Sequence, residues 1–392
     1  MTVGHRRSFV SNLLLLGMLA PCVMVAQAAP AAAATTVTRA DLGKAYLRLD
    51  RVVAGLTLDD TTRARVNRAF DGSTLSFFGG KFAAAVGTID SLTTALSGAP
   101  IAPVPAAAAR IIGGRAPSVT RDALLARLAR IDSTGPLAQA LVSARARAGL
   151  LVDVPSLERG AEFLSDPVRL AADLRKEVAA LERGRNPYAF HAGDLWRSFR
   201  GAGSVVIPYR IVAAPAVAKS KAPVPVLFAF HGAGADENIF IDAYGAGITP
   251  SMAQSQGVLL VSPATTAFGA SPANFDILLA TLRTEYNVDT TRVYVLGHSM
   301  GAGLSARLAS QRPAAIAAAI CLAGGSPVTV DGAPPMLFIG AELDPIIPAR
   351  RVQAAASATP TATYQELPHE GHTLMVGNGI RSAFPWMLAR HR

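Results

Sequence analysis

The stretch of sequence that decides the fold reads Val293-Tyr294-Val295-Leu296-Gly297-His298-Ser299-Met300-Gly301. Its first four residues are apolar and favour a strand, whereas residues 300–311 have the pattern of a helix. A sharp turn must join the two, and Gly297, Gly301 and Gly303 supply small residues where Cβ atoms would clash. Such a turn exposes the Ser299 hydroxyl above a helix N-terminus, which favours developing negative charge. Ser299 is therefore a candidate nucleophile; the alternative is an ordinary glycine-rich turn.

Strands and helices alternate on both sides of this stretch. Such an alternation predicts the α/β class, with a mainly parallel sheet flanked by helices. The first two strands have only a short connection containing proline and lysine, which favours an antiparallel orientation. The predicted strands span 205–212, 224–230, 258–262, 293–296, 316–322, 336–339 and 361–367, and the main helices between them span 272–286, 300–311 and 349–358.

A second glycine-containing loop follows the predicted strand 224–230 and reads His231-Gly232-Ala233-Gly234. A loop of this kind can turn backbone N–H groups toward the oxygen of an acyl group, together with the N–H of Met300. The loop donor is Gly232 or Ala233, and the sequence leaves both open. The alternative is a plain glycine turn in which His231 has a structural hydrogen bond.

A serine hydroxyl becomes a good nucleophile only when an imidazole takes its proton, and that imidazole needs an acid to hold its tautomer. Asp344 and His372 lie after the strands 336–339 and 361–367, in the chain order Ser, Asp, His. Glu342 is the substitute acid and His369 the substitute base. His298, inside the turn, is interpreted as a packed neighbour.

Residues 1–28 have the pattern of an export signal. Arg6 and Arg7 precede an apolar stretch, and Ala28 ends a site suited to cleavage. The arginine pair also resembles a twin-arginine signal. We therefore expect a periplasmic or extracellular protein without an integral membrane span after cleavage. Removal of the signal takes Cys22 away, and Cys321, in a buried strand, then has no partner for an intramolecular disulfide.

The region 38–185 is rich in alanine and helical in pattern, and we expect it to form a domain joined by a linker at 186–203 to a catalytic domain at 204–392. Thr57 with Asp60 predicts a capped helix start, and Asp166 predicts another. Arginines on these helices are interpreted as solvent-facing. Because the region has no constellation of catalytic residue types, we expect it to shape access to the site, dock to envelope material, or only stabilise the chain.

Composition narrows the function classes. The chain has 392 residues, of which 51% are hydrophobic and 16% charged, which excludes general disorder. Its formal net charge of +10 comes mostly from arginine, but no dense basic run predicts nucleic-acid binding. The histidines lack the spacing of a zinc motif, so no metal or organic cofactor is expected.

Residues 204–392 resemble the α/β-hydrolase superfamily, through His-Gly-Ala-Gly, Val-Tyr-Val-Leu-Gly-His-Ser-Met-Gly, Asp344-Pro345 and Glu370-Gly371-His372. Within it they are most similar to secreted esterases related to polyhydroxybutyrate depolymerases and feruloyl esterases, and to the catalytic domain of prolyl-oligopeptidase-like peptidases. The alanine in His-Gly-Ala-Gly differs from the loop of many lipases. The helical N-terminal region is unlike the propeller of oligopeptidases.

The resemblance implies an exported serine hydrolase that cleaves small or polymeric carboxylic esters through an acyl-enzyme. Ser299 would attack, His372 would act as base and then acid, and Asp344 would orient His372. One alternative is a peptidase or acyltransferase that uses the same acyl-enzyme. The other is a non-catalytic binding protein of the cell envelope.

Overall fold

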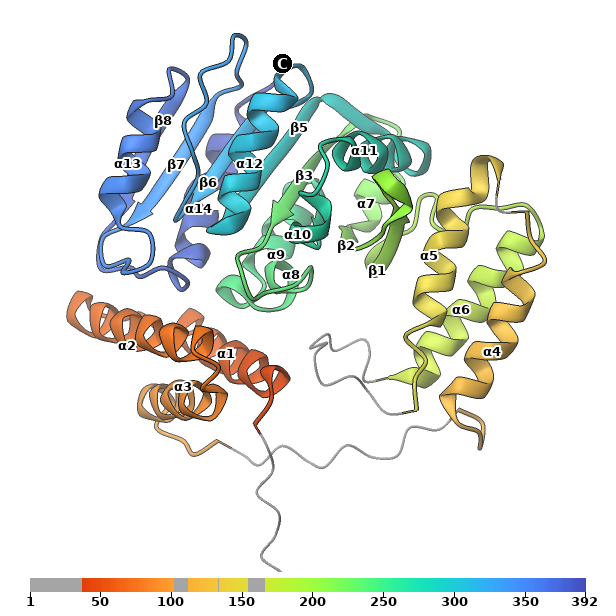
Figure 1. The fold of residues 1–392 in the computed structure, drawn as a ribbon, viewed down its shortest axis with the longest axis horizontal. Coiled ribbons are helices and arrows are strands. Elements are labelled where there is room, and N and C mark those ends of the chain that lie inside the picture. The colour runs from red at the N-terminus through yellow and green to blue at the C-terminus, as the bar shows by residue number, and fades with distance from the viewer. Residues whose placement is uncertain (1–36, 102–111, 133, 154–165) are drawn as a thin grey trace, which may run out of the picture. The chain divides into compact units, whose positions relative to one another are not determined.

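An eight-stranded sheet forms the centre of the computed structural model, which describes residues 37–101, 112–132, 134–153 and 166–392. Its strand order is β1-β2-β4-β3-β5-β6-β7-β8, and β3 to β8 are parallel to one another (Figure 1). The predicted α/β class with a mainly parallel sheet is confirmed. The strands are β1 Gly193–Arg200, β2 Val206–Ala213, β3 Val224–Phe230, β4 Leu259–Pro263, β5 Val288–His298, β6 Ala318–Leu322, β7 Met336–Ala341 and β8 Ala362–Leu367.

At one edge of the sheet, β2 runs opposite to strands β3 to β8, and β1 runs opposite to β2. Strand β2 pairs antiparallel with β4 on one side and with β1 on the other. The expected antiparallel orientation of the first two predicted strands is therefore found, with β4 lying between β2 and β3. The predicted linker at 186–203 is wrong, because it contains β1. Asp194 and Arg197 interrupt the apolar pattern of this strand, and Arg197 is nevertheless buried.

Alternate residues of the central strands point to opposite faces of the sheet, and each face has its own hydrophobic cluster. On β3, Phe228 and Phe230 belong to one cluster and Leu227 and Ala229 to the other. Burial of both faces explains why β3, β6 and β7 are apolar throughout. The covering helices after β3 are α8 Ile239–Asp242, α9 Ile248–Ser255, α10 Thr265–Phe268, α11 Ala273–Glu285, α12 Met300–Gln311, α13 Ala349–Ser357 and α14 Met375–Leu388, with α7 Pro215–Ala218 before β3.

The helices of the N-terminal region divide between the two clusters. Those of the first group share their cluster with α14, and those of the second group share theirs with α11 and α12. Residues 37–392 form one compact unit, so the helical region is not a domain apart from the sheet. The first group is α1 Arg39–Ala54, α2 Asp60–Phe78 and α3 Phe82–Ser97, and the second is α4 Pro117–Leu128, α5 Ala138–Ala148 and α6 Pro167–Glu182.

Three helices of this region, α1, α2 and α6, begin at a residue whose side chain caps the helix. Asp166 accepts a hydrogen bond from the N–H of Arg169, as predicted. The predicted pairing of Thr57 with Asp60 is wrong, because Asp59 caps α2 by accepting from the N–H of Thr62 at 2.9 Å. An aspartate side chain suits this role because it reaches the free N–H groups of the first turn.

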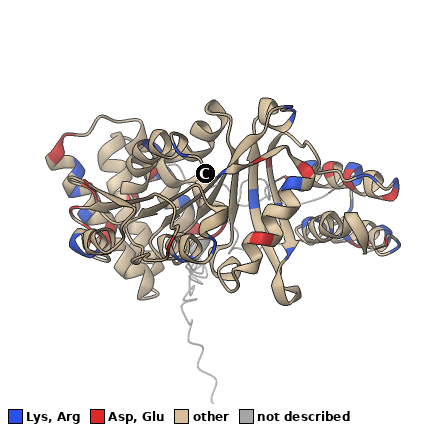
Figure 2. Ribbon diagram, turned by 90° about the horizontal axis from the view of Figure 1, so that it is seen from above, with Lys and Arg blue, Asp and Glu red and all other residues tan. Residues whose placement is uncertain are grey.

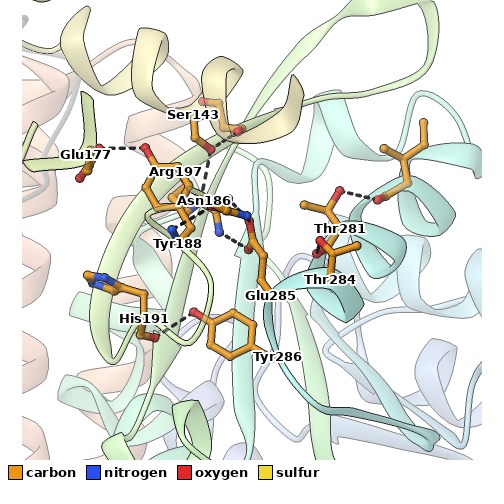
Figure 3. A network of polar contacts seen from close by, with 12 residues as sticks. Ser143, Glu177, Asn186, Tyr188, His191, Arg197, Thr281, Thr284, Glu285 and Tyr286 are labelled. Atoms are coloured by element: carbon orange, nitrogen blue, oxygen red, sulfur yellow. Dashed lines mark hydrogen bonds and ion pairs between the residues drawn. The ribbon is translucent and has the colours of Figure 1, made fainter. Parts of the chain in front are cut away.

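A buried polar network joins α5 and α6 to the sheet (Figure 3). Arg197 on β1 makes two hydrogen bonds to the carboxylate of Glu285 at the end of α11, and its Nε donates to Ser143 on α5. The Tyr188 hydroxyl donates to Glu177 on α6. Arg147 on α5 is 3% exposed and pairs with Glu177, so the interpretation of the helix arginines as solvent-facing is wrong for this one.

Basic and acidic residues are interspersed along the helices (Figure 2). Arg127 pairs with Glu182, and Arg312 pairs with Asp276. Among the described residues, no helix combines the length and apolar character needed to cross a membrane. Within the same residues, no group of three or more His, Cys, Asp or Glu side chains is placed to hold a metal ion. The predicted signal at 1–28, including Cys22, lies outside the described residues.

Candidate active site

Ser299 lies at the turn between β5 and α12 with φ 54° and ψ −115°, a backbone conformation that residues other than glycine rarely adopt. Close approach of the backbone imposes this turn. A Cβ atom on Gly301 would lie 1.9 Å from the carbonyl oxygen of Phe230, and one on Gly297 would lie 2.0 Å from that of Gly301. Gly303 has no atom within 4 Å of such a Cβ, so the expectation of a clash there is wrong.

The structure brings Ser299, His372 and Asp344 together from three loops at the carboxyl ends of β5, β8 and β7. The His372 Nε2 atom lies 3.0 Å from Ser299 Oγ, and its Nδ1 atom lies 2.7 Å from Asp344 Oδ2. The other carboxylate oxygen of Asp344 accepts from the N–H groups of Ile346 and Ile347, each at 2.8 Å. Asp344 is therefore fixed by its own loop and can hold the His372 ring in one orientation.

The substitute residues contact each other instead. The N–H of His369 donates to Glu342 Oε2 at 2.7 Å. The imidazole of His369 lies 3.5 Å from the carboxylates of both Glu342 and Asp60. The exposed side chain of Glu342 thus binds the backbone of the loop after β8. Asp344, two residues later, faces inward and is buried.

His298 packs behind His372, as expected of a neighbour. Its Nε2 atom lies 2.9 Å from the carbonyl oxygen of His372, and its Nδ1 atom lies 2.7 Å from the Tyr244 hydroxyl. Burial, together with nearby His372, holds the pKa of His298 well below its usual value, so the ring is neutral. A carbonyl can only accept, so Nε2 carries the proton and Nδ1 accepts from Tyr244.

The loop after β3 approaches Ser299 closely. A Cβ atom on Gly232 would lie 3.0 Å from His298 Nδ1 and 3.3 Å from Ser299 Cβ, so this position has little room for a side chain. Burial raises the pKa of Tyr244, and the backbone N–H of Gly232 opposes that rise. His231 is held by its ring, since Nε2 accepts from the N–H of Thr265 at 2.9 Å. Gly232 and Ala233, the two predicted loop donors, both line the cavity beside Ser299.

Three residues of α2 contact the loop that carries His372, although no sequence motif connects that helix with the site. Asp71 Oδ2 accepts from the N–H of His372 at 2.8 Å, and Asn67 Oδ1 accepts from the N–H of Gly371 at 2.8 Å. Arg63 donates to Glu370 Oε1 at 2.7 Å. Their only signal in the sequence is a four-residue spacing of polar side chains, which is common on exposed helix faces.

A cavity of about 600 Å³ opens beside Ser299 and His372. Helices α1 to α3 supply a largely apolar wall, and the loop after β3 supplies a polar one. Phe77 of α2 reaches toward this loop, because a Cβ on Gly234 would lie 2.6 Å from its ring. The apolar wall is formed by Leu42, Tyr46, Leu47, Phe70, Phe77, Phe78 and Ile89.

Comparison with known proteins gives one family and several related folds. Residues 240–370, less than half of the chain, match the family model described as serine aminopeptidase, S33. No curated protein sequence matches the chain.

Three solved structures illustrate the similarity of the fold. A thermostable esterase is 22% identical, with a TM-score of 0.41, over 51% of this chain and 63% of its own, so less than two thirds of that esterase is covered. An S-formylglutathione hydrolase from Staphylococcus aureus is 11% identical, with a TM-score of 0.42, over 50% of this chain and 99% of its own. An esterase from Pyrobaculum calidifontis is 16% identical, with a TM-score of 0.39, over 50% and 84%.

Proposed function

We propose that this chain, a serine hydrolase with an α/β-hydrolase fold, cleaves carboxylic esters through an acyl-enzyme formed on Ser299. The observation that carries the proposal is the hydrogen-bonded series Ser299 Oγ, His372 Nε2, His372 Nδ1 and Asp344 Oδ2, with distances of 3.0 and 2.7 Å. In this order the carboxylate fixes the imidazole tautomer, and the free nitrogen of the ring faces the hydroxyl.

The reaction follows from these contacts. Asp344 accepts from the Nδ1–H of His372, so Nε2 is free to take the proton of Ser299 as Oγ attacks the ester carbonyl. The collapse of the tetrahedral intermediate breaks the bond to the alcohol, and His372 returns the proton to the departing oxygen. Water then repeats the sequence on the acyl-enzyme. Asp344 stabilises the imidazolium that forms in each half of the reaction.

The negative charge on the substrate oxygen would be held by two backbone N–H groups. Met300 is the first residue of α12, so its N–H has no partner within the helix and points out of its positive end. Gly232 or Ala233 would supply the second donor, since both line the cavity beside Ser299. Gly232 would contribute by its small size, which lets the loop lie against Ser299.

The cavity favours a small ester with an apolar acyl group over a bulky polymer. A volume of about 600 Å³ is typical of small-molecule sites, and the ring and aliphatic side chains of α1 to α3 would pack on such a group. A series of p-nitrophenyl esters with acyl chains from acetyl to palmitoyl tests this in the purified protein. The highest kcat/KM should fall at an intermediate chain length. Absence of hydrolysis across the whole series would contradict the ester proposal.

Peptide hydrolysis is the second candidate, and the match to the serine aminopeptidase family favours it. Asp236 and Glu237 line the cavity, and carboxylates there would attract a substrate ammonium group. Amino-acid p-nitroanilides, measured beside the matching p-nitrophenyl esters, separate the two functions. We expect the esters to be cleaved and the anilides not. Faster cleavage of the anilides, reduced by Asp236→Asn, would establish the peptidase instead.

We also propose export, on the basis of the signal pattern at 1–28. Cleavage after Ala28 predicts a mature N-terminus at Ala29, which N-terminal sequencing of the protein from its native cell fractions would detect. A full-length protein confined to the cytoplasmic fraction would contradict the proposal. A twin-arginine route adds the expectation that replacing Arg6 and Arg7 by lysine blocks export.

A further inference from the structure

We propose that Asp71 on α2 is a positioning residue for the catalytic histidine: with Asn67, it holds the backbone of the loop 368–374 so that the His372 ring reaches Ser299. This inference rests on the proposed function, since it concerns the base of that reaction. It also gives the N-terminal helical region a direct part in the chemistry, in addition to its place in the cavity wall.

The contact is arranged along one face of α2. Arg63, Asn67 and Asp71 are spaced by four residues, so their side chains lie in a row along the helix. They contact residues 370, 371 and 372 of the loop, in that order. Arg63 donates to the Glu370 carboxylate, and Asn67 Nδ2 donates to that carboxylate as well, at 3.1 Å. The N–H groups at 371 and 372 then donate to Asn67 and Asp71, each at 2.8 Å.

The loop depends on this support because of its own backbone. His369 has φ 60°, so the chain reverses sharply before the catalytic residue. Gly371 lies so close to the helix that a Cβ atom there would be 2.2 Å from Asp71 Oδ2. The N–H groups of 371 and 372 are buried against α2, and each would cost about 1–3 kcal/mol if it had no acceptor.

Burial of the Asp71 carboxylate is unfavourable, because the charged group loses its hydration. Asp71 is 1% exposed, and its Oδ1 atom has no hydrogen-bond partner in the described part of the chain. An amide could accept the same hydrogen bond from the N–H of His372 with less loss of hydration. The carboxylate therefore has a use that depends on its position beside His372.

Besides accepting a hydrogen bond, Asp71 acts on His372 through its negative charge. Burial raises the pKa of Asp71 to about 6, while the N–H and the positive charge of His372 oppose that rise. Above this pH the carboxylate is negative and attracts the positive charge that His372 carries when it has taken the serine proton. The other titratable groups that face His372 are Asp344, in the loop after β7, and neutral His298, at the end of β5.

Two variants separate the hydrogen bond from the charge. Asp71→Ala removes the acceptor, and we expect kcat for an ester to fall roughly 10²-fold with little change in KM, because a small displacement of the base disrupts the reacting geometry. Asp71→Asn keeps an amide oxygen as acceptor, so kcat at pH 8 should stay within a factor of about three of the wild type. Because this variant loses the negative charge, its kcat/KM profile should have an acid limb shifted to lower pH.

Asp60→Asn is the matched control. Asp60 is a carboxylate on the same helix, its side chain is 82% exposed, and its ion pair is with His369 rather than His372. Its activity and pH profile should equal those of the wild type. Circular dichroism melts of all three variants would show whether any loss of activity follows from unfolding.

A readout independent of turnover is the far-downfield proton resonance of the His372 Nδ1–H bonded to Asp344, assigned by its loss in His372→Ala. We expect Asp71→Ala to weaken or shift it and Asp60→Asn to leave it unchanged. Wild-type kcat and an unchanged resonance in Asp71→Ala would overturn the proposal. Equal losses in Asp71→Ala and Asp71→Asn, with the acid limb in place, would overturn it too. If the wild type hydrolyses no substrate, the proposed function fails, whereas the resonance still decides whether Asp71 positions the ring.

Discussion

Asp344 and Glu342 stand two residues apart after the same strand, and their surroundings assign them different roles. Asp344 is buried against the His372 ring, and Glu342 is bound to the N–H of His369 near the surface. That Ser299, Asp344 and His372 lie together could be predicted, because each of these residues follows directly from a recognisable strand. The choice between neighbours two residues apart depended on which way the loop turns.

Exchange of the acid tests this assignment. Asp344→Asn should lower kcat by about 10⁴-fold, because the amide leaves His372 in the wrong tautomer. Glu342→Gln should retain most of the activity, since its amide oxygen can still accept from His369. Steady-state kinetics on one p-nitrophenyl ester would measure both. A larger loss in Glu342→Gln than in Asp344→Asn would reverse the assignment.

The glycines around Ser299 provide a second test at the scale of single residues. Gly301→Ala places a Cβ atom 1.9 Å from the Phe230 carbonyl oxygen, so it should prevent folding or greatly lower the melting temperature. Gly303→Ala, two residues further along α12, meets no atom within 4 Å and should raise the free energy of unfolding by about 0.5–1 kcal/mol. Thermal melts compare the two. A tolerated Gly301→Ala would contradict the close turn described here.

Elements were predictable where the pattern is local. Seven of the strands follow from apolar runs bounded by turns, and three of the helices between them, α11, α12 and α13, from their period. Strand β1 was missed because Asp194 and Arg197 interrupt its apolar pattern, and the burial of Arg197 depends on Glu285, 88 positions away. The contacts of α2 with the His372 loop were also not predicted, because they too join residues that are far apart in the sequence. About 300 residues of chain separate the partners, and polar spacing on a helix does not reveal a distant loop.

Helix α1 carries a buried carboxylate that makes the stability of the protein depend on pH. Asp50 is 4% exposed and accepts from the N–H of Ala246 at 2.6 Å. Burial raises its pKa to about 7, against the opposing effects of the Ala246 N–H and Arg381. The folded state therefore binds more protons than the unfolded state between the usual pKa of 3.8 and about 7, and stability falls as the pH rises through that window.

Replacing this carboxylate should remove the effect. Asp50→Asn can still accept from Ala246 and does not ionise, so its free energy of unfolding should exceed that of the wild type at pH 8 by up to about 4 kcal/mol. The difference should vanish near pH 4. Denaturant titrations at both pH values measure it, with the exposed Asp122→Asn on α4 as control. A wild-type protein as stable as Asp50→Asn at pH 8 would contradict the buried charge.

At the scale of the whole molecule, the helical region and the sheet belong to one compact unit. The sequence suggested a separate domain, because composition changes near residue 200 and no catalytic pattern precedes it. The structure shows instead that the helices complete both hydrophobic clusters, line the cavity and contact the His372 loop. Such mutual packing of distant segments leaves no mark on local composition.

A chain shortened to begin at Gly201 tests this integration. It lacks β1, helices α1 to α6 and the hydrogen-bond acceptors Asn67 and Asp71. It should therefore be insoluble or unfolded and should react with no ester. Circular dichroism and labelling by a fluorophosphonate would measure the outcome. A folded, active fragment with altered ester preference would instead mean that the helices only shape access.

Covalent labelling of Ser299 decides whether this residue is the nucleophile of an acyl-enzyme. A fluorophosphonate should add once to the intact protein, and peptide mass mapping should place the adduct on Ser299. Ser299→Ala, shown by circular dichroism to be folded, should show neither the adduct nor ester hydrolysis above the level of His372→Ala. Undiminished labelling or turnover in folded Ser299→Ala would contradict the account.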